Sequence, residues 1–205
     1  MKIKKVLTGY GAANTYIVYD ENTLDGVMVD PSDRADILIK EANGINIKYI
    51  LLTHPHFDHI GALEETSQHF NAPVVIHKED ALSLTDTRYN LCTFAGVKEN
   101  KKEADLTVTE DDTLTVGNIK LSFIHTPGHT RGSMCIFVGD KDLFTGDTLF
   151  KGCIGRTDFD GGSSEEILKS LKKLLKLDDD IRIYPGHGEE STIGFEKMTN
   201  PYIYD

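Results

Sequence analysis

Short apolar runs recur along the chain, and turn residues separate most of them. Such runs, rich in Val, Ile, Leu and Tyr, are typical of buried or half-buried strands. We therefore predict strands at residues 2–7, 15–19, 27–30, 49–52, 74–76, 106–108, 114–116, 119–125, 134–138, 143–145 and 181–184. This many strands in 205 residues indicates two sheets packed together.

Helical patterns lie between the strands. We predict helices at 33–41 (capped by Ser32 or Asp33), 60–70, 78–84 and near Phe195. The clearest pattern covers 164–177, where Ser163 and Glu166 have capping-box spacing and one face is apolar. Its lysine-rich face is compatible with a membrane anchor, but packing on a sheet with the lysines in solvent is the commoner arrangement. The chain therefore reads as an α/β protein with helices outside two sheets.

Length and charge narrow the class of protein. The 205 residues fit one domain, 1–205, with enough chain to bury a full core. A net charge of −11 argues against nucleic-acid or membrane partners, which favour a basic face. The sequence shows no signal-peptide layout and no run long enough to span a bilayer. An odd number of cysteines at no framework spacing suits reduced thiols, so we expect a soluble cytoplasmic protein.

A histidine-rich stretch follows the predicted strand at 49–52. It reads Thr-His-Pro-His-Phe-Asp-His over residues 53–59, and imidazole and carboxylate are common ligands of zinc and related metals. Because Pro55 disfavours helix at His54, we expect the stretch to begin in a loop. There His54 and His56 can converge on one ion while Asp58 and His59 reach a second. A histidine-rich surface turn is the alternative.

Three further candidate ligands lie just after predicted strands, each preceded by glycine. They are His129, Asp147 and His187. Loops at strand ends are where a rigid sheet commonly presents functional residues. The shared arrangement of the four loops predicts one metal site. Three other histidines, His69, His77 and His125, fit no ligand position, and we assign them structural roles.

The order of these motifs resembles the metallo-β-lactamase superfamily. The Asp147 loop, the following residues 155–158 and the tail at 192–194 and 200–202 look like the short glyoxalase II-like (hydroxyacylglutathione hydrolase-like) metallohydrolases. The resemblance implies a four-layer αββα sandwich with metals at one edge of the two sheets. It assigns His54, His56 and His129 to one metal and Asp58, His59 and His187 to another, with Asp147 bridging. Asp30 matches an aspartate that supports a ligand from behind, although a turn-forming role before Pro31 is equally open.

A two-metal site suggests hydrolysis. Two divalent ions, with zinc expected and iron or mixed iron and zinc as alternatives, can share a water and lower its pKa to about 7. A thioester such as S-lactoylglutathione suits this chemistry, because a thiol with a pKa near about 8.5 leaves with little acid assistance. An amide would need its nitrogen protonated, and the sequence shows no dedicated acid. Asp58 can shuttle a proton, although a metal ligand is a poor base.

Departures from other branches of the superfamily support this choice. Antibiotic-hydrolysing members are typically exported, and many have cysteine in place of Asp147. The sequence also lacks the flavin domain of flavodiiron proteins and the extra domains of the RNA-processing branch. Only 18 residues follow His187, so we expect no separate C-terminal glutathione-binding domain.

Substrate contacts are less well defined by sequence. Lys151 and Arg156 are candidate cationic contacts for an anionic substrate, although a structural pair between Arg156 and Asp158 is the preferred interpretation. The polar segment 85–104 is either a solvated excursion or a loop beside the site, in which case Tyr89 or Arg88 faces the substrate.

Three other functions stay open. An iron-dependent persulfide dioxygenase is the main alternative, and there the resemblance implies one iron held by His54, His129 and Asp147. A lactone or ester hydrolase would use nearly the same metal chemistry. A non-enzymatic metal-binding or sensory domain is the third, and the complete two-metal set argues against it.

Overall fold

Two six-stranded sheets form the centre of the computed structural model, which describes residues 1–9 and 13–203. The first sheet has the strand order β1-β2-β3-β4-β5-β6. Its strands are β1 (Lys2–Val6), β2 (Thr15–Tyr19), β3 (Asp25–Val29), β4 (Asn46–Leu51), β5 (Val74–His77) and β6 (Leu106–Val108). The first three strands pair antiparallel, and the pairs from β3 to β6 are parallel.

The second sheet has the order β14-β13-β10-β9-β8-β7. Its strands are β7 (Thr113–Val116), β8 (Ile119–His125), β9 (Met134–Val138), β10 (Asp142–Gly146), β13 (Arg182–Pro185) and β14 (Ser191–Thr192). β10 and β13 pair in parallel, so the residues that follow them leave the sheet at the same edge. A separate short hairpin joins β11 (Leu149–Phe150) and β12 (Cys153–Ile154).

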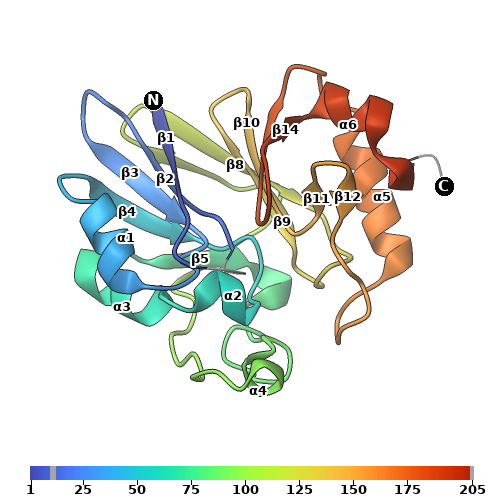
Figure 1. Ribbon diagram of the computed structural model, residues 1–205. Coiled ribbons are helices and arrows are strands. Elements are labelled where there is room, and N and C mark those ends of the chain that lie inside the picture. Colours follow the sequence, from blue (N-terminus) through green and yellow to red (C-terminus); the bar gives the residue numbers. More distant parts are fainter. Residues whose placement is uncertain (10–12, 204–205) are drawn as a thin grey trace.

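Helices cover the outer face of each sheet (Figure 1). The first sheet carries α1 (Ala35–Glu41) and α3 (Leu63–Phe70), and the second carries α5 (Ser164–Leu174) and α6 (Ile193–Thr199). The short helices are α2 (Phe57–Ile60), α4 (Cys92–Ala95), η1 (Lys78–Asp80) and η2 (Pro201–Ile203). The fold is therefore an αββα sandwich, as the sequence predicted.

Three buried clusters account for the layers. Leu38 and Leu63 pack the first helical layer against Ile50, and all three are fully buried. The sheets meet across a second cluster that includes Tyr16 and Phe144, whose rings lie 5.0 Å apart edge to face. The third cluster packs the apolar stripe of α5 against the second sheet. Alternating inward residues on the strands and one stripe on each helix thus provide the driving force for the sandwich.

Most predicted elements are present, and two helix starts differ from the prediction. Ser163 caps α5 as expected, because its hydroxyl oxygen accepts a hydrogen bond from the N–H of Glu166. α1 is not capped by Ser32 or Asp33: its N-cap is Arg34, at φ 51°, with no capping side chain. Ser32 is buried instead, and its hydroxyl lies 3.1 Å from that of Thr15.

The helix predicted at 60–70 is two helices, and the first of them begins earlier. α2 starts at Phe57, so Asp58 and His59 lie on a helical turn rather than in the loop that holds His54 and His56. Gly61 and Ala62 separate α2 from α3. The predicted helix at 78–84 is reduced to the 3-10 turn η1.

Within residues 1–9 and 13–203, no helix combines the length and apolar character needed to cross a membrane.

Candidate metal centre

Strand ends from both sheets place the predicted ligands in one region. His54 and His56 follow β4, and His129 follows β8. Asp147 and His187 follow the parallel neighbours β10 and β13, and the N–H of Gly186 donates to the carbonyl of Gly146 at 2.8 Å. The sheets are also linked there, since the N–H of Met134 donates to the carbonyl of Thr53 at 3.0 Å. The edge where the sheets meet therefore carries all the candidate ligands.

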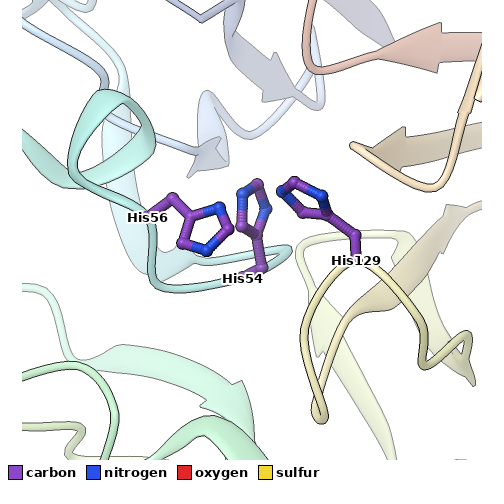
Figure 2. A group of neighbouring side chains, drawn as sticks. All are labelled: His54, His56 and His129. Atoms are coloured by element: carbon purple, nitrogen blue, oxygen red, sulfur yellow. The ribbon is translucent and has the colours of Figure 1, made fainter. Parts of the chain in front are cut away.

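The candidate ligands form overlapping groups whose donor atoms lie within 4.8 Å of one another. The first group is His54, His56 and His129, whose rings point toward one another in Figure 2. The second is Asp58, His59 and His187, with the Asp58 carboxylate 3.0 Å from His187 Nε2.

Asp147 lies between the two groups. Its Oδ1 is 3.3 Å from His59 Nε2, and its Oδ2 is 3.6 Å from His129 Nε2 and 3.7 Å from His187 Nε2. One carboxylate thus approaches ligands of both groups.

Unpaired donor atoms show that this set fits metal ions. Among the described residues, the buried side-chain atoms without a hydrogen-bond partner are His54 Nε2, His56 Nε2, His59 Nε2, His129 Nε2 and Asp147 Oδ1. Leaving a polar atom buried and unpaired costs about 1–3 kcal/mol each. All five belong to the candidate ligand set, and imidazole nitrogen with carboxylate oxygen is the donor chemistry of zinc and iron sites.

The protonation states of His54, His56 and Asp147 suit ligation. Burial and then the neighbouring His129 lower the pKa of His56 to about 3, and burial with His59 and His129 lowers that of His54. Both imidazoles are therefore neutral at pH 7, as a metal ligand must be. Burial alone would raise the pKa of Asp147, but His59, followed by His129, holds it well below its ordinary value, so this carboxylate stays ionised.

The pKa of His59 shifts in the other direction. Burial lowers this pKa, but Asp147, Asp58 and Asp30 outweigh burial and raise it. A metal bound there would therefore displace a proton.

The Asp30 carboxylate holds His59 and Thr53 in place through hydrogen bonds. Its Oδ2 lies 2.9 Å from His59 Nδ1 and accepts a hydrogen bond from Thr53 Oγ1 at 2.6 Å, while Oδ1 accepts from the Thr53 N–H at 2.8 Å. The carboxylate fixes the His59 ring so that Nε2 faces the metal region. The backbone of Asp30 has a positive φ of 50°.

The His129 ring is oriented by a backbone carbonyl. His129 Nδ1 lies 2.8 Å from the carbonyl oxygen of Arg156, so Nδ1 carries the proton and Nε2 faces His54 and His56. The Arg156 guanidinium makes two 2.7 Å hydrogen bonds to Asp158, the structural pairing preferred from sequence.

The other candidate substrate contacts belong to neither ligand group. Lys151 pairs with Glu189 at 2.5 Å, two residues beyond His187. The Tyr89 ring lies 4.8 Å from the Arg88 guanidinium carbon and 5.4 Å from that of Arg131. His125 stacks on His77 with ring centroids 4.0 Å apart, and neither residue belongs to a ligand group.

Asn14, which the sequence did not single out, holds the loop that carries His187. Its backbone N–H donates to the Gly186 carbonyl at 2.6 Å, and its amide donates to the carbonyls of Pro185 and Gly188 at 2.9 and 3.2 Å. Tyr16 Oη also donates to Pro185, at 2.8 Å. Asn14 is buried, so these hydrogen bonds are shielded from water.

Asn14→Ala is expected to weaken metal binding at Asp58, His59 and His187. The lost amide removes two hydrogen bonds from the His187 loop, each contributing about 1 kcal/mol to stability. Loss of such support typically lowers metal affinity about 10–100-fold. Competition with a chromophoric chelator measures the two affinities separately, and exposed Asn43→Ala is the matched control. Unchanged affinity for the second ion would contradict the role assigned to Asn14.

Asp80 is a buried carboxyl beneath the loop that carries His129. Thr130 Oγ1 donates to Asp80 Oδ2 at 2.5 Å, and the N–H of Gly132 also reaches this carboxyl. Burial raises the pKa of Asp80 to about 6, against the lowering effect of these hydrogen bonds. Between about pH 4 and 6 the folded protein therefore keeps a proton that the unfolded chain has lost.

The stability contributed by Asp80 consequently falls as the pH rises through that window. Asp80→Asn keeps an acceptor oxygen without the charge, so the variant does not lose this stability. The free energy of unfolding of the variant minus that of wild type should therefore increase from pH 4 to pH 6. The gain is about 1.4 kcal/mol for each pKa unit of the shift. Urea denaturation of chelator-treated protein measures it, with exposed Asp111→Asn as the control. Parallel pH profiles for Asp80→Asn and wild type would refute the prediction.

Comparison with known proteins agrees with the fold and the site. Residues 8–187 match the sequence profile of the metallo-beta-lactamase superfamily, and the chain belongs to this superfamily. It is an enzyme of the metallo-hydrolase class, whose members bind divalent metals through the kind of His and Asp cluster described above.

Two similar proteins are named as hydrolases. The chain is 36% identical to probable metallo-hydrolase YqgX of Bacillus subtilis, covering 99% of this chain and 98% of the relative. It is 34% identical to hydroxyacylglutathione hydrolase GloC of Haemophilus influenzae, covering 93% of this chain and 92% of the relative.

The fold of the chain is also similar to solved structures, including the following three. BLEG-1, named a B3 metallo-beta-lactamase, aligns with a TM-score of 0.93 and 34% identity over 100% of both chains. TTHA1623, in a di-iron-bound form, aligns with a TM-score of 0.86 and 31% identity, covering 97% of this chain and 99% of the other. ETHE1 from Myxococcus xanthus aligns with a TM-score of 0.83 and 28% identity, covering 98% of this chain and 84% of the other.

Proposed function

We propose that this protein hydrolyses a thioester, S-lactoylglutathione or a related acyl thiol, at a dinuclear metal site. The position of Asp147 carries the proposal, because its carboxylate lies within 3.7 Å of ligand nitrogens from both groups. A carboxylate shared in this way would bring two ions together, as in two-metal hydrolases. His54, His56 and His129 would hold one ion, and Asp58, His59 and His187 the other.

Bound metal ions supply a water of lowered pKa and polarise a carbonyl oxygen. The protein fixes the geometry around them: Asp30 orients His59, the Arg156 carbonyl orients His129, and Asn14 holds the His187 loop. Asp58 is the residue best placed to move a proton. Burial alone would raise its pKa, but His59 and His187 keep it below the ordinary value, so Asp58 is ionised and a weak base.

The weakness of that base favours a thioester over an amide. A thiol leaves as the thiolate with little protonation, since its pKa is about 8.5, whereas an amine must be protonated as it leaves. The resemblance to GloC, named a hydroxyacylglutathione hydrolase, supports the same choice of substrate. Lys151, which pairs with Glu189 two residues beyond His187, is the proposed cationic contact for an anionic thiol.

Thiol release tests the proposal. Protein purified without chelator, with its metals quantified, is assayed for free thiol from S-lactoylglutathione and other acyl thiols, and for opening of a β-lactam because BLEG-1 is named a β-lactamase. We expect thioester turnover that chelation abolishes and zinc restores. Full loading with two metals and no turnover of any thioester would refute the proposal.

A persulfide dioxygenase is the second candidate, and the likeness to ETHE1 favours it. His54, His129 and Asp147 could hold one iron in a two-histidine, one-carboxylate arrangement with open positions. Oxygen uptake with glutathione persulfide separates the two functions. One iron per chain together with oxygen consumption would replace the hydrolase proposal, whereas two metals and thiol release would exclude the dioxygenase.

A further inference from the structure

The segment 85–104, whose role the sequence left open, is fixed beside the metal centre. The N–H of Phe57, directly after His56, donates to the Asn90 carbonyl at 2.8 Å. Further along, the N–H of Lys101 donates to the Glu64 carboxylate at 2.5 Å. The buried Asn100 amide donates to the Leu84 carbonyl at 2.9 Å. The short helix α4 within this segment lies below α2 in the view of Figure 1.

A row of aromatic rings leads from His56 to α4. The Phe159 ring lies 6.1 Å from the His56 ring, edge to face. The Phe94 ring, on α4, lies 5.5 Å from that of Phe159. Phe159 is partly buried, but the Phe94 side chain is 75% exposed. Two segments distant in sequence thus form one apolar wall, Phe94 and Phe159, that begins beside a candidate metal ligand.

Arg156 adds little net charge to the wall. Its guanidinium carbon lies 4.0 Å from the Phe159 ring centroid, and its nitrogens make two 2.7 Å hydrogen bonds to Asp158. The charge is therefore balanced within the loop, and the planar group extends the stacking surface. The wall suits an uncharged, flat or alkyl group better than a carboxylate.

Covering an exposed aromatic surface is favourable in proportion to the apolar area removed from water. We propose that Phe94 and Phe159 bind an apolar acyl group, aromatic or alkyl, so that among the acyl thiols of the proposed function those with an apolar acyl group are hydrolysed in preference to S-lactoylglutathione. This inference rests on the proposed thioester hydrolysis. The acyl side is chosen because a polar, charged carrier thiol would gain nothing from an uncharged aromatic wall.

Ligand binding tests the wall without turnover. The S-benzyl and S-ethyl thioethers of glutathione replace the thioester carbonyl by a methylene and cannot be hydrolysed. Isothermal titration of zinc-loaded protein should show about tenfold tighter binding of the benzyl compound, a difference of about 1.4 kcal/mol. Phe94→Ala should remove most of that difference. Met198→Ala, which truncates another exposed apolar side chain, should leave it unchanged. Equal Kd values for the two compounds in wild type, or equal effects of the two variants, would overturn the inference.

Turnover separates the acyl wall from the proposed function. Thioesters are compared that carry a phenyl group on the acyl side or on the thiol side. Phe94→Ala should lower the kcat/KM ratio of phenylacetyl to acetyl thioester about tenfold. If a phenyl group raises kcat/KM only when it is on the thiol side of the thioester, the acyl assignment is wrong. If no thioester is hydrolysed while the benzyl preference and its loss in Phe94→Ala persist, the wall stands and the proposed reaction fails.

Discussion

Asp147→Ala is expected to abolish paired metal binding and to remove nearly all hydrolytic activity. The carboxylate approaches nitrogens of His59, His129 and His187, so its loss removes a shared ligand from both groups. The fall in metal affinity should exceed the roughly 10–100-fold that follows loss of a supporting residue. Metal analysis after gel filtration, together with thiol-release kinetics, measures both effects.

A matched histidine change controls for general damage. His69 is exposed and belongs to no ligand group, so His69→Ala should retain metal and activity. Asp147→Asn preserves the side-chain shape and tests the charge alone, which guards against misfolding of the alanine variant. If Asp147→Ala and His69→Ala have equal effects, Asp147 does not link the two ligand groups.

Asp30→Asn should cost about 10–100-fold in affinity for the ion at Asp58, His59 and His187. Asparagine tolerates the positive φ of this position and can still accept from the Thr53 N–H. It replaces the charged oxygen that faces His59 Nδ1, so the ring loses the partner that orients it. Stepwise metal titration should show one site weakened and the His54, His56 and His129 site nearly intact.

Asp30→Ala separates the two roles of this residue. Alanine leaves the buried N–H of Thr53 unpaired, at about 1–3 kcal/mol. It also places a residue with no polar side chain in a left-handed conformation, at about 1–2 kcal/mol. The free energy of unfolding of metal-free protein should therefore fall further than in Asp30→Asn. Equal metal affinities of wild type and both variants would show that His59 does not need this support.

The sequence was sufficient to predict the sandwich because its signals are local. Strand runs, the capping box at Ser163 and the glycines before His129 and His187 depend on neighbouring residues. The ligand spacing resembles a known superfamily, so the seven candidate ligands could be named before their geometry was seen. Helix boundaries were less accurate: α2 begins before Ile60 and carries two of those candidates, because the start of a short helix leaves little periodic signal.

Contacts between distant residues could not be predicted in this way. Asn14 binds carbonyls 171 and 174 residues away, and the His129 ring is oriented by the backbone of Arg156. The ring contact between Phe94 and Phe159 joins the polar segment 85–104 to a residue more than 60 positions beyond Phe94 in the chain. These side chains are placed by tertiary packing, which neither spacing nor periodicity encodes.

The division of the ligands between the sheets has a consequence for how the protein holds together. His54, His56, Asp58 and His59 follow the first sheet, whereas His129, Asp147 and His187 follow strands of the second. Bound ions would therefore act as cross-links between the two halves of the sandwich. Each tenfold rise in free metal above the Kd would add about 1.4 kcal/mol to the free energy of unfolding. The metal supply of the cell would then govern the lifetime of the folded chain as well as its catalysis.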